Sequence, residues 1–391
     1  MPKLLWANAY CLLDTSSGAS MAVRTMLQAL QARGWEIEIV GATVFDSPTG
    51  RTRLASVWDK VEDKSTNVLN VQDGDLMHRL VKTQSTVRGQ MTADEEGVWF
   101  GLYRNRLVGF QPDIVCFYGG QPLDLLTPIE GRRAGAKTVA YLPNGNYTGA
   151  RWCEDVDLIF TDSQATVDFY RDQDGIGVTP VGQFIDPSRV VAGHHIRERV
   201  LFVNPSFQKG AAVVAQMALM LENERPDIQF EVVESRGSWQ QVLQLVTRQL
   251  GDERDHLSNV ILTQNPQDMR PVYSRARVLF APSLWWESFG RVAAEALMNG
   301  IPAIVTNRGG LPEVVGNAGL KVDFPEELYQ KPYTNIMKSG RLAPLIKKVE
   351  EFFDNEQLYS EYSRRAFEQG KRHHLDASVN RLVAAMTSIK G

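Results

Sequence analysis

The stretch VLFAPSLWWESFGRVAAEALMNGIPAIVT, residues 278–306, decides the fold that we expect for this chain. An apolar run at 278–283 precedes a segment with helical spacing, which begins near Ser288 and stops at Gly300, and a second apolar run follows at 301–306. A strand, a helix and a strand in this order form a β-α-β unit, whose strands are parallel and whose crossover is right-handed. The stretch therefore predicts a parallel sheet covered by helices.

Similar units occur in both halves of the chain. A strand at 4–9, a helix at 19–33 and a strand at 35–42 open the N-terminal half, and the rhythm restarts after a break at 187–198. A chain of 391 residues is too long for one ordinary core. We therefore predict an α/β protein with two doubly wound domains, at 1–187 and 188–375, and a C-terminal helix at 376–391 that can cross back to the first domain.

Composition and charge limit the classes of function. Residues 1–187 hold 17 Lys and Arg against 23 Asp and Glu, and the whole chain has a net charge of -4. This is not the basic excess of a nucleic-acid binder, and it leaves at most peripheral membrane contact through a local patch at Arg132, Arg133 and Lys137. The three cysteines are widely spaced, so we expect no disulfide framework and a reducing, cytoplasmic setting.

Two glutamates flank the beginning of the expected helix at 288–299. Glu287 and Glu295 are eight residues apart, which is about 12 Å along a helix and too far for a pair of catalytic carboxylates. The free amides of a first helical turn bind phosphate well. The layout fits one extended ligand, with a hydroxyl-rich group at Glu287, a diphosphate at the helix end and a diol at Glu295. The amides that we expect at the diphosphate belong to Ser288, Phe289, Gly290 and Arg291.

The longer stretch SLWWESFGRVAAEALMNGIPAIVTNRGGLPEVVG, residues 283–316, resembles the donor-binding signature of retaining glycosyltransferases of family 4. Those enzymes have the GT-B fold, in which two Rossmann-like domains face a central cleft. The resemblance implies that Glu287 contacts the sugar of a nucleotide-diphosphate sugar and that Glu295 contacts the ribose. In the alternative interpretation, both acids are ordinary charges near a helix start, which the helix dipole favours.

A second motif, FVNPSFQKG at 202–210, bears on the leaving group. The family usually has an arginine and a lysine here, which neutralise the departing diphosphate. Lys209 and Gly210 match that pattern, whereas residues 204–206 stand in place of the arginine. We assign Lys209 and Glu287 to the catalytic site, and Arg291 or Arg308 can supply the second positive charge; the alternative is that Lys209 is a surface lysine at a helix start.

The remaining candidate residues are less clearly marked. Gly18 stands where the family has a Gly-rich loop near the donor phosphate, although it can equally serve a turn. The segment VAYLPNGNY, residues 139–147, lacks the histidine that the family often has near the donor sugar. We assign Gln264 to nucleotide binding, and Asn144, Asn146 and Tyr118 to the sugar or the acceptor.

The predicted function is a retaining, metal-independent hexosyltransferase. The matches to Asp-x-Asp at 73–75 and 155–157 are short enough to be accidental, so we expect neither a metal nor another cofactor. The donor is of the UDP or GDP type, and the acceptor is a glycan, lipid-linked or protein hydroxyl in bacterial glycan or glycoconjugate synthesis. A sugar phosphorylase or nucleotide-sugar epimerase on the same fold remains an alternative. A non-catalytic subunit that binds a sugar nucleotide or glycan is an alternative of another class.

Overall fold

The structure is a computed structural model that describes every residue except 64, 120, 121, 236, 265, 267, 390 and 391. The chain divides into two compact units. Unit 1 consists of Met1–Phe184 and Leu375–Gly391, and unit 2 consists of Ile185–His374. The chain passes between the units after residues 184 and 374, close to the positions 187 and 375 that the sequence suggested.

Unit 1 is built on a mostly parallel sheet of eight strands in the order β3-β4-β2-β1-β5-β6-β7-β8. The strands are β1 (Lys3–Ala7), β2 (Glu36–Ala42), β3 (Val68–Asp73), β4 (Leu76–Val81), β5 (Ile114–Tyr118), β6 (Lys137–Leu142), β7 (Leu158–Thr161) and β8 (Thr179–Pro180). Only the β3–β4 pair is antiparallel among these strands. The irregular segment 42–100 thus extends the sheet through β4, which pairs with β2. Because β2 and β5 lie on opposite sides of β1, the strand order reverses between β1 and β5.

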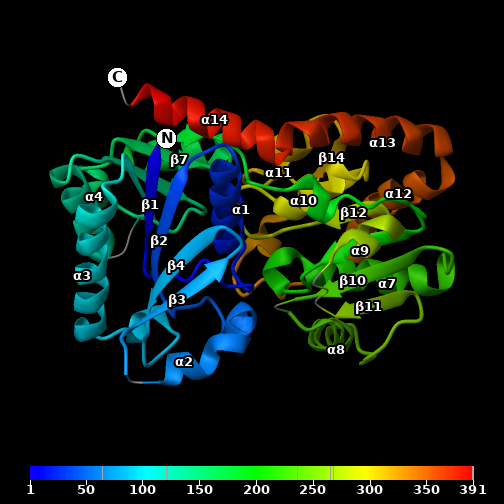
Figure 1. Ribbon diagram of the computed structural model, residues 1–391. Helices are drawn as coiled ribbons and strands as arrows, with labels where there is room; N and C mark the ends of the chain where they lie inside the picture. The colour runs from blue at the N-terminus through cyan, green and yellow to red at the C-terminus, as the bar shows by residue number, and fades with distance from the viewer. Residues whose placement is uncertain (64, 120–121, 236, 265, 267, 390–391) are drawn as a thin grey trace. The chain divides into compact units, whose positions relative to one another are not determined.

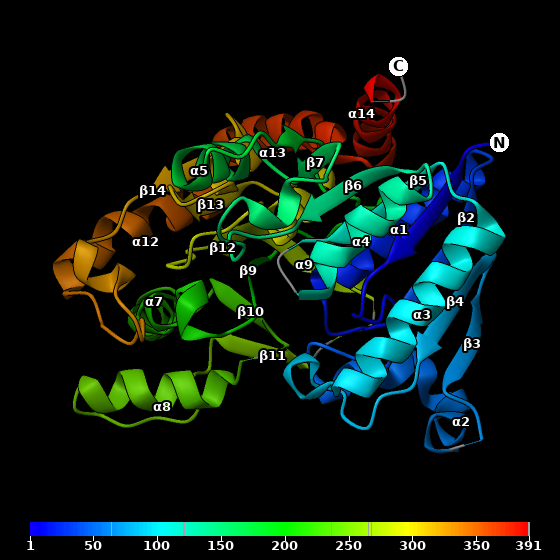
Figure 2. The same cartoon turned by 90° about the vertical axis from the view of Figure 1, so that its left-hand side faces the viewer.

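The alternation of side chains along β1 explains the layers of unit 1. Leu4 and Trp6 pack with α1 (Gly18–Ala32) and α14 (Leu375–Ser388), whereas Leu5 and Ala7 pack with α3 (Ala93–Phe110). Helices α4 (Pro122–Arg133) and α5 (Gln164–Asp174) complete the unit. Figures 1 and 2 show α14, in red, beside α1. The last helix therefore belongs to the core of the N-terminal unit.

Unit 2 has a fully parallel sheet of six strands in the order β11-β10-β9-β12-β13-β14. The strands are β9 (Arg199–Val203), β10 (Gln229–Glu234), β11 (Val260–Gln264), β12 (Ala276–Ala281), β13 (Ala303–Thr306) and β14 (Gly319–Val322). One face packs on α7 (Ala211–Glu224), α8 (Trp239–Gln249) and α12 (Ser339–Asp354), and the other on α9 (Arg270–Arg275), α10 (Arg291–Met298) and α11 (Leu311–Val315). Helix α13 (Glu356–Gly370) packs on α10. The strand order reverses between β9 and β12.

The start of α10 differs from the sequence-based expectation. The helix begins at Arg291 rather than near Ser288, because Gly290 has a backbone φ of 103°, which a helix does not allow. Ser288, Phe289 and Gly290 therefore belong to the loop that precedes the helix. The end of the helix agrees with the prediction, since Asn299 is its C-cap and Gly300 has a φ of 65°.

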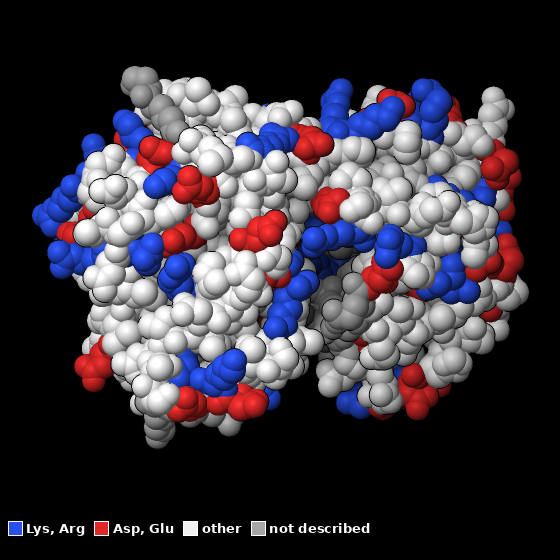
Figure 3. Space-filling view, viewed as in Figure 1, with Lys and Arg blue, Asp and Glu red and all other residues white. Residues whose placement is uncertain are grey.

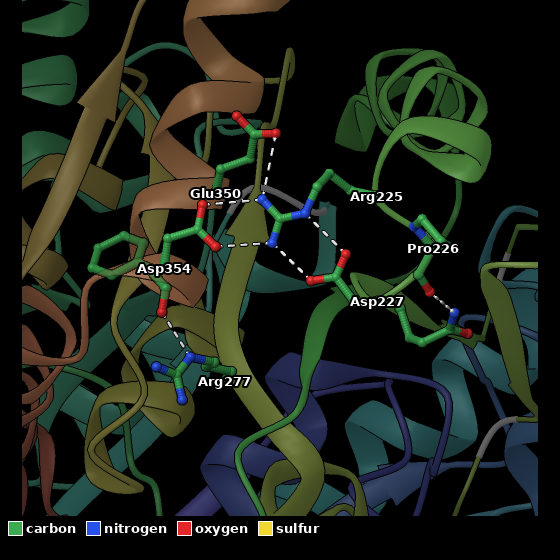
Figure 4. Close-up of polar contacts among 8 residues, drawn as sticks. Arg225, Pro226, Asp227, Arg277, Glu350 and Asp354 are labelled. Atoms are coloured by element: carbon green, nitrogen blue, oxygen red, sulfur yellow. Dashed lines mark hydrogen bonds and ion pairs between the residues drawn. The ribbon is translucent and has the colours of Figure 1, made fainter.

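An arginine at the C-terminal end of α7 fastens that helix to α12. Arg225 lies among three carboxylates, with Nη2 2.7 Å from Asp227 and 2.9 Å from Asp354, and Nη1 3.7 Å from Glu350 (Figure 4). Its hydrogen bond holds the pKa of Asp227 below the usual value. Since Glu350 and Asp354 both belong to α12, this network holds α7 and α12 together on their shared face of the sheet.

The surface carries both signs of charge. Figure 3 shows Lys and Arg interspersed with Asp and Glu on the viewed face of each unit. The three cations of the candidate membrane patch are each close to an acid: Arg132 to Asp155 at 3.3 Å, Arg133 to Glu130 at 2.7 Å and Lys137 to Asp157 at 3.7 Å. These acids weaken the attraction that the patch would exert on an anionic surface. Among the described residues, none of the helices is long and apolar enough to cross a bilayer.

The role of α14 in unit 1 predicts a large effect of one substitution. Leu382 is fully buried and packs in the same core as Val23 and Leu27 of α1. We expect Leu382→Ala to lower the free energy of unfolding of unit 1 by about 2–5 kcal/mol, because it leaves a cavity. Urea unfolding followed by circular dichroism measures the change. Thr387→Ala, on the exposed side of α14, is the control and should change stability by less than about 0.5 kcal/mol; equal effects would contradict the packing of α14 described above.

Candidate functional site

The reversal of strand order in unit 2 brings Lys209 and Glu287 together. Lys209 follows β9 and Glu287 follows β12, and these two strands are neighbours in the sheet. The two side chains form an ion pair, and Ser283 Oγ donates a hydrogen bond of 2.8 Å to the same Glu287 oxygen, Oε1. The side chains are 28% and 15% exposed, so solvent reaches both only in part. In open α/β sheets, ligands bind beyond the carboxyl ends of the strands at such a reversal.

Backbone contacts hold the Lys209 loop against the end of β12. Gly210 has a φ of 81°, and a Cβ atom there would lie 2.1 Å from the carbonyl oxygen of Pro282. The carbonyl oxygen of Gln208 accepts hydrogen bonds of 2.9 Å from the amides of Leu284 and Trp285. Only glycine fits at position 210, because any side chain would collide with the neighbouring backbone. The loop geometry therefore places Lys209 directly beside the segment that carries Glu287.

The Gly309–Gly310 pair, which follows β13, contacts the backbone of Glu287 and Ser288. A Cβ atom at Gly309 would lie 1.9 Å from the carbonyl oxygen of Glu287, and one at Gly310 would lie 2.6 Å from that of Ser288. The amide of Gly310 donates a hydrogen bond of 2.7 Å to the Glu287 carbonyl. The two glycines of the signature thus permit close contact between two loops, which explains why both positions lack a side chain.

Glu295 is held inside unit 2 by two partners. Its exposed fraction is 6%, its Oε2 accepts a hydrogen bond of 2.6 Å from the Tyr273 hydroxyl, and its Oε1 accepts one of 2.7 Å from Arg291 Nε. Burial, together with the negative charge of Glu295, raises the pKa of Tyr273 well above its usual value. The carboxylate is therefore more enclosed than a solvated helix acid. Each oxygen retains a further lone pair, so contact with a ribose diol remains a prediction.

Two polar residues beside Lys209 escaped the sequence-based assignment. Asn204 has a φ of 66°, which is uncommon outside glycine, and it stands with Ser206 where the resemblance led us to expect an arginine. Asn204 Oδ1 and Ser206 Oγ are shielded from solvent and have no hydrogen-bond partner among the described residues. The same holds for one guanidinium nitrogen in each of Arg291 and Arg308. Buried polar atoms without partners are costly, so several of them on the loops after β9, β12 and β13 are typical of a binding site.

The other unit 2 candidates occupy different environments. The side chain of Phe289 is 3% exposed and lies edge-on to His373 at 5.5 Å, so only its backbone is available to a ligand. Ser288 is half-buried in the loop before α10. Gln264 is exposed at the end of the edge strand β11, where its amide donates to Glu234. Strand β10 lies between β11 and β9, so Gln264 is about 10 Å from the end of β9, and both lie at the carboxyl ends of the strands.

The unit 1 candidates belong to the carboxyl-terminal side of three neighbouring strands, β1, β5 and β6: Tyr118 ends β5, and the others come after β1 or β6. Gly18 is the first residue of α1, and a Cβ atom there would meet no described atom within 4 Å, so the turn itself does not require glycine. The Tyr118 ring is buried against Trp6 at 4.9 Å, and this contact makes it part of the core. Asn144 Oδ1 accepts a hydrogen bond of 3.0 Å from the amide of Asn146. Of these residues, Asn146 is the exposed one.

The Asp-x-Asp matches have structural partners. Asp73 Oδ1 accepts a hydrogen bond of 2.6 Å from Arg24, and Asp157 Oδ2 accepts one of 2.8 Å from the amide of Thr138. Within the described part of the chain, no group of three or more His, Cys, Asp or Glu side chains is arranged to hold a metal ion.

The region that contains this site is similar to known proteins. Residues 197–369 match the family model of Glycosyl transferases group 1. Spore coat protein SA of Bacillus subtilis (strain 168) is 30% identical over 128 residues, which cover 32% of this chain and 34% of that protein. D-inositol 3-phosphate glycosyltransferase of Corynebacterium jeikeium (strain K411) is 35% identical over 123 residues, or 29% of each chain. The matched stretch spans about a third of the length of these relatives.

The fold is similar to solved structures over nearly the whole chain. Anabaena Alr3699/HepE, solved in complex with UDP and glucose, matches with a TM-score of 0.67 at 14% identity, covering 99% of this chain and 100% of the other. At this identity the match concerns the fold alone. It confirms the expected fold class, an α/β protein of the GT-B type with two Rossmann-like domains.

The glycine contacts at Glu287 predict the effect of one added methyl group. We expect Gly309→Ala to destabilise unit 2 by about 2 kcal/mol or more, since its Cβ atom would overlap the Glu287 carbonyl at a φ of 56°. Thermal unfolding monitored by calorimetry measures the effect. Gly340→Ala is the matched control, because a Cβ atom at that helical position meets no described atom within 4 Å. A Gly309→Ala protein as stable as the control would disprove the close contact.

Proposed function

We propose that this chain, whose residues 197–369 match the family model of Glycosyl transferases group 1, is a glycosyltransferase that moves a sugar from a nucleotide-diphosphate sugar to an acceptor hydroxyl. The observation that carries the proposal is the Lys209–Glu287 ion pair at the strand reversal of unit 2. A cation and an anion side by side match a ligand that joins a diphosphate to a hydroxyl-rich sugar.

The donor would lie along the carboxyl ends of the unit 2 strands. Glu287 Oε2 faces the sugar hydroxyls in this arrangement, and the amides before α10 face the diphosphate. The ribose approaches Glu295, and the base extends toward Gln264 on β11. Support for a uridine donor comes from the Anabaena protein, which was solved with UDP and glucose. A guanosine donor is the second possibility, and we propose a hexose as the transferred sugar.

The chemical task of the site is to stabilise the departing diphosphate. When the bond between the anomeric carbon and the phosphate oxygen breaks, negative charge grows on that oxygen. Lys209 Nζ would transfer its interaction from Glu287 to this oxygen, and Glu287 would then accept hydrogen bonds from the sugar. Arg291 or Arg308 would add positive charge, and Asn204 and Ser206 offer polar contacts in place of an arginine.

We propose that the sugar is transferred with retention of its anomeric configuration and without a metal ion. In support, the two acids of the unit 2 site are engaged by neighbouring groups, Glu287 by Lys209 and Glu295 by Arg291 and Tyr273. Such engaged carboxylates are poor nucleophiles for a covalent intermediate. The acceptor hydroxyl would therefore attack on the face from which the phosphate leaves, and its proton would pass to that phosphate. Side-chain cations would replace the metal as the source of positive charge.

The acceptor belongs to the same proposal. We infer that a glycan, lipid-linked or protein hydroxyl is bound by unit 1, beyond the carboxyl ends of β1, β5 and β6, through Gly18, Tyr118, Asn144 and Asn146. Cytoplasmic glycan or glycoconjugate synthesis in a bacterium is the setting that we propose.

Product analysis separates this function from its alternatives. Transfer from UDP-glucose or a GDP-sugar to an acceptor, with the product's anomeric configuration read by NMR and activity kept in EDTA, is the expected result. Dependence on inorganic phosphate would indicate a phosphorylase, and isomerised donor without an acceptor would indicate an epimerase. Nucleotide-sugar binding with neither hydrolysis nor transfer would indicate a non-catalytic subunit.

Lys209 should govern turnover. We expect Lys209→Ala to lower kcat about 10²–10³-fold, because the departing phosphate loses its nearest cation, with a smaller change in donor KM. Lys209→Arg should recover part of the loss. Lys321→Ala, at an exposed position in β14, is the control and should leave both constants unchanged. Unchanged kcat in Lys209→Ala would remove this residue from the mechanism.

Glu295 should govern nucleotide affinity. We expect Glu295→Gln to weaken UDP or GDP binding about tenfold or more, because the amide accepts fewer hydrogen bonds from a diol. Nucleotide-induced increases in melting temperature measure the affinity, since a ligand that binds only the folded state stabilises it. Tyr273→Phe is the control: it removes one hydrogen-bond donor to Glu295 but leaves the carboxylate charged. This variant should bind nucleotide nearly as well as the wild type. Equal binding by wild type and Glu295→Gln would show that Glu295 is purely structural.

A further inference from the structure

A cavity open to solvent lies in unit 2, at the end of α10 opposite to Arg291. Its volume is about 460 Å³, and its walls come from the segment before β9, from Met298 to Gly300 at the end of α10, and from one side of α13. On α13 the lining residues Ser360, Ser363, Arg364 and Phe367 follow helical spacing. Helix α10 is eight residues long, so the cavity is about 12 Å from the loop that carries Glu287.

The cavity is lined by positive and neutral groups. Arg197, Arg364 and His195 line it, and no Asp or Glu does. Within the described residues, neither arginine has a carboxylate within ion-pair distance, whereas the next residue on α13, Arg365, pairs with Glu361. His195 Nδ1 is shielded from solvent and has no hydrogen-bond partner among the described residues. The wall therefore offers unneutralised donors to a ligand.

The end of α10 accounts for only part of this charge. Arg197 donates to the Asn299 carbonyl and, at 3.5 Å, to the Ala276 carbonyl, so it also caps the helix. A helix C-terminus carries roughly half a negative charge, which is less than the full charge of one guanidinium. Arg364 is exposed on α13 and adds a second full charge. The two guanidinium charges therefore exceed the partial charge of the helix end, and burial lowers the pKa of Arg197.

The remaining wall suits the body of a small organic molecule. Val191, which is half-buried, supplies apolar surface, and Phe367, which is 50% exposed, stands at the rim. Ser360 supplies a hydroxyl. The volume falls within the range of small-molecule sites and exceeds what a lone inorganic anion fills. Two arginines with forked donors match the oxygens of a phosphate group.

We propose that this cavity binds a small phosphate monoester, with the phosphate between Arg197 and Arg364 and the organic part against Val191 and Phe367. The site is separate from the donor site and does not rest on the proposed transferase activity. Because α10 connects the two places, a ligand here contacts the helix whose first turn carries Arg291, the partner of Glu295.

Phenyl phosphate is a suitable probe, because it joins a phosphate to an apolar ring. Isothermal titration calorimetry on the full chain should show one binding event for the wild type, at least about tenfold weaker binding for Arg364→Gln, and little binding for Ser360→Tyr, whose ring would occupy the cavity. Arg365→Gln is the matched control and should bind like the wild type. Lys209→Gln should also bind like the wild type, since Lys209 lies at the other site.

Four outcomes would overturn the proposal. The first is no binding by the wild type at probe concentrations on the order of 10 mM, and the second is equal binding by Arg364→Gln and the wild type. The third is equal weakening of binding by Arg364→Gln and Arg365→Gln. The fourth is loss of binding in Lys209→Gln. The last would place the probe at the donor site. Since binding heat is measured rather than turnover, a chain without transferase activity would still give a clear result.

Discussion

The close contact between the Gly309–Gly310 loop and the backbone of Glu287 is the constraint on which the candidate site depends. Two carbonyl oxygens, those of Glu287 and Ser288, occupy the space that side chains at these positions would need. Gly210 makes the same kind of contact with Pro282 on the other side. Three loops, after β9, β12 and β13, are thereby pressed together at one edge of the sheet. The ion pair of Lys209 and Glu287 follows from this packing, since neither side chain has to span a gap.

The electrostatics of the site follow a simple pattern, in which each acid has a cation as its nearest charged neighbour. Glu287 pairs with Lys209, and Glu295 pairs with Arg291. An anionic ligand competes for these cations, so its binding would exchange one set of ion pairs for another rather than bring a charge to a bare surface. Such an exchange reduces the cost of keeping charged groups half-buried while the site is empty.

Much of the fold could be predicted from the sequence, because alternating apolar runs and helical segments specify a parallel sheet. The ion pair between Lys209 and Glu287 was harder to predict from the sequence. The two residues are far apart in the chain and meet only because β9 and β12 are neighbours in the sheet. The predicted start of α10 was wrong because Gly290 has a positive φ and lies so close to Leu311 that a Cβ atom would not fit, and no local pattern reveals this packing. The sequence marks Asn204 and Ser206 only as residues that replace an arginine and assigns them no role, because short polar residues after a strand look like an ordinary turn. The donor, sugar and acceptor roles of the individual residues stay predictions.

The return of α14 to unit 1 has a consequence for the order of folding. Residues 375–388 provide core side chains, including Val379, Leu382 and Met386, to the unit whose sheet begins at residue 3. A ribosome synthesises the whole of unit 2 before it reaches these residues. Unit 1 must therefore wait, with one apolar face of α1 uncovered, until the final helix emerges, whereas unit 2 is complete in sequence earlier. In this chain the first unit to be made is the last that can be finished.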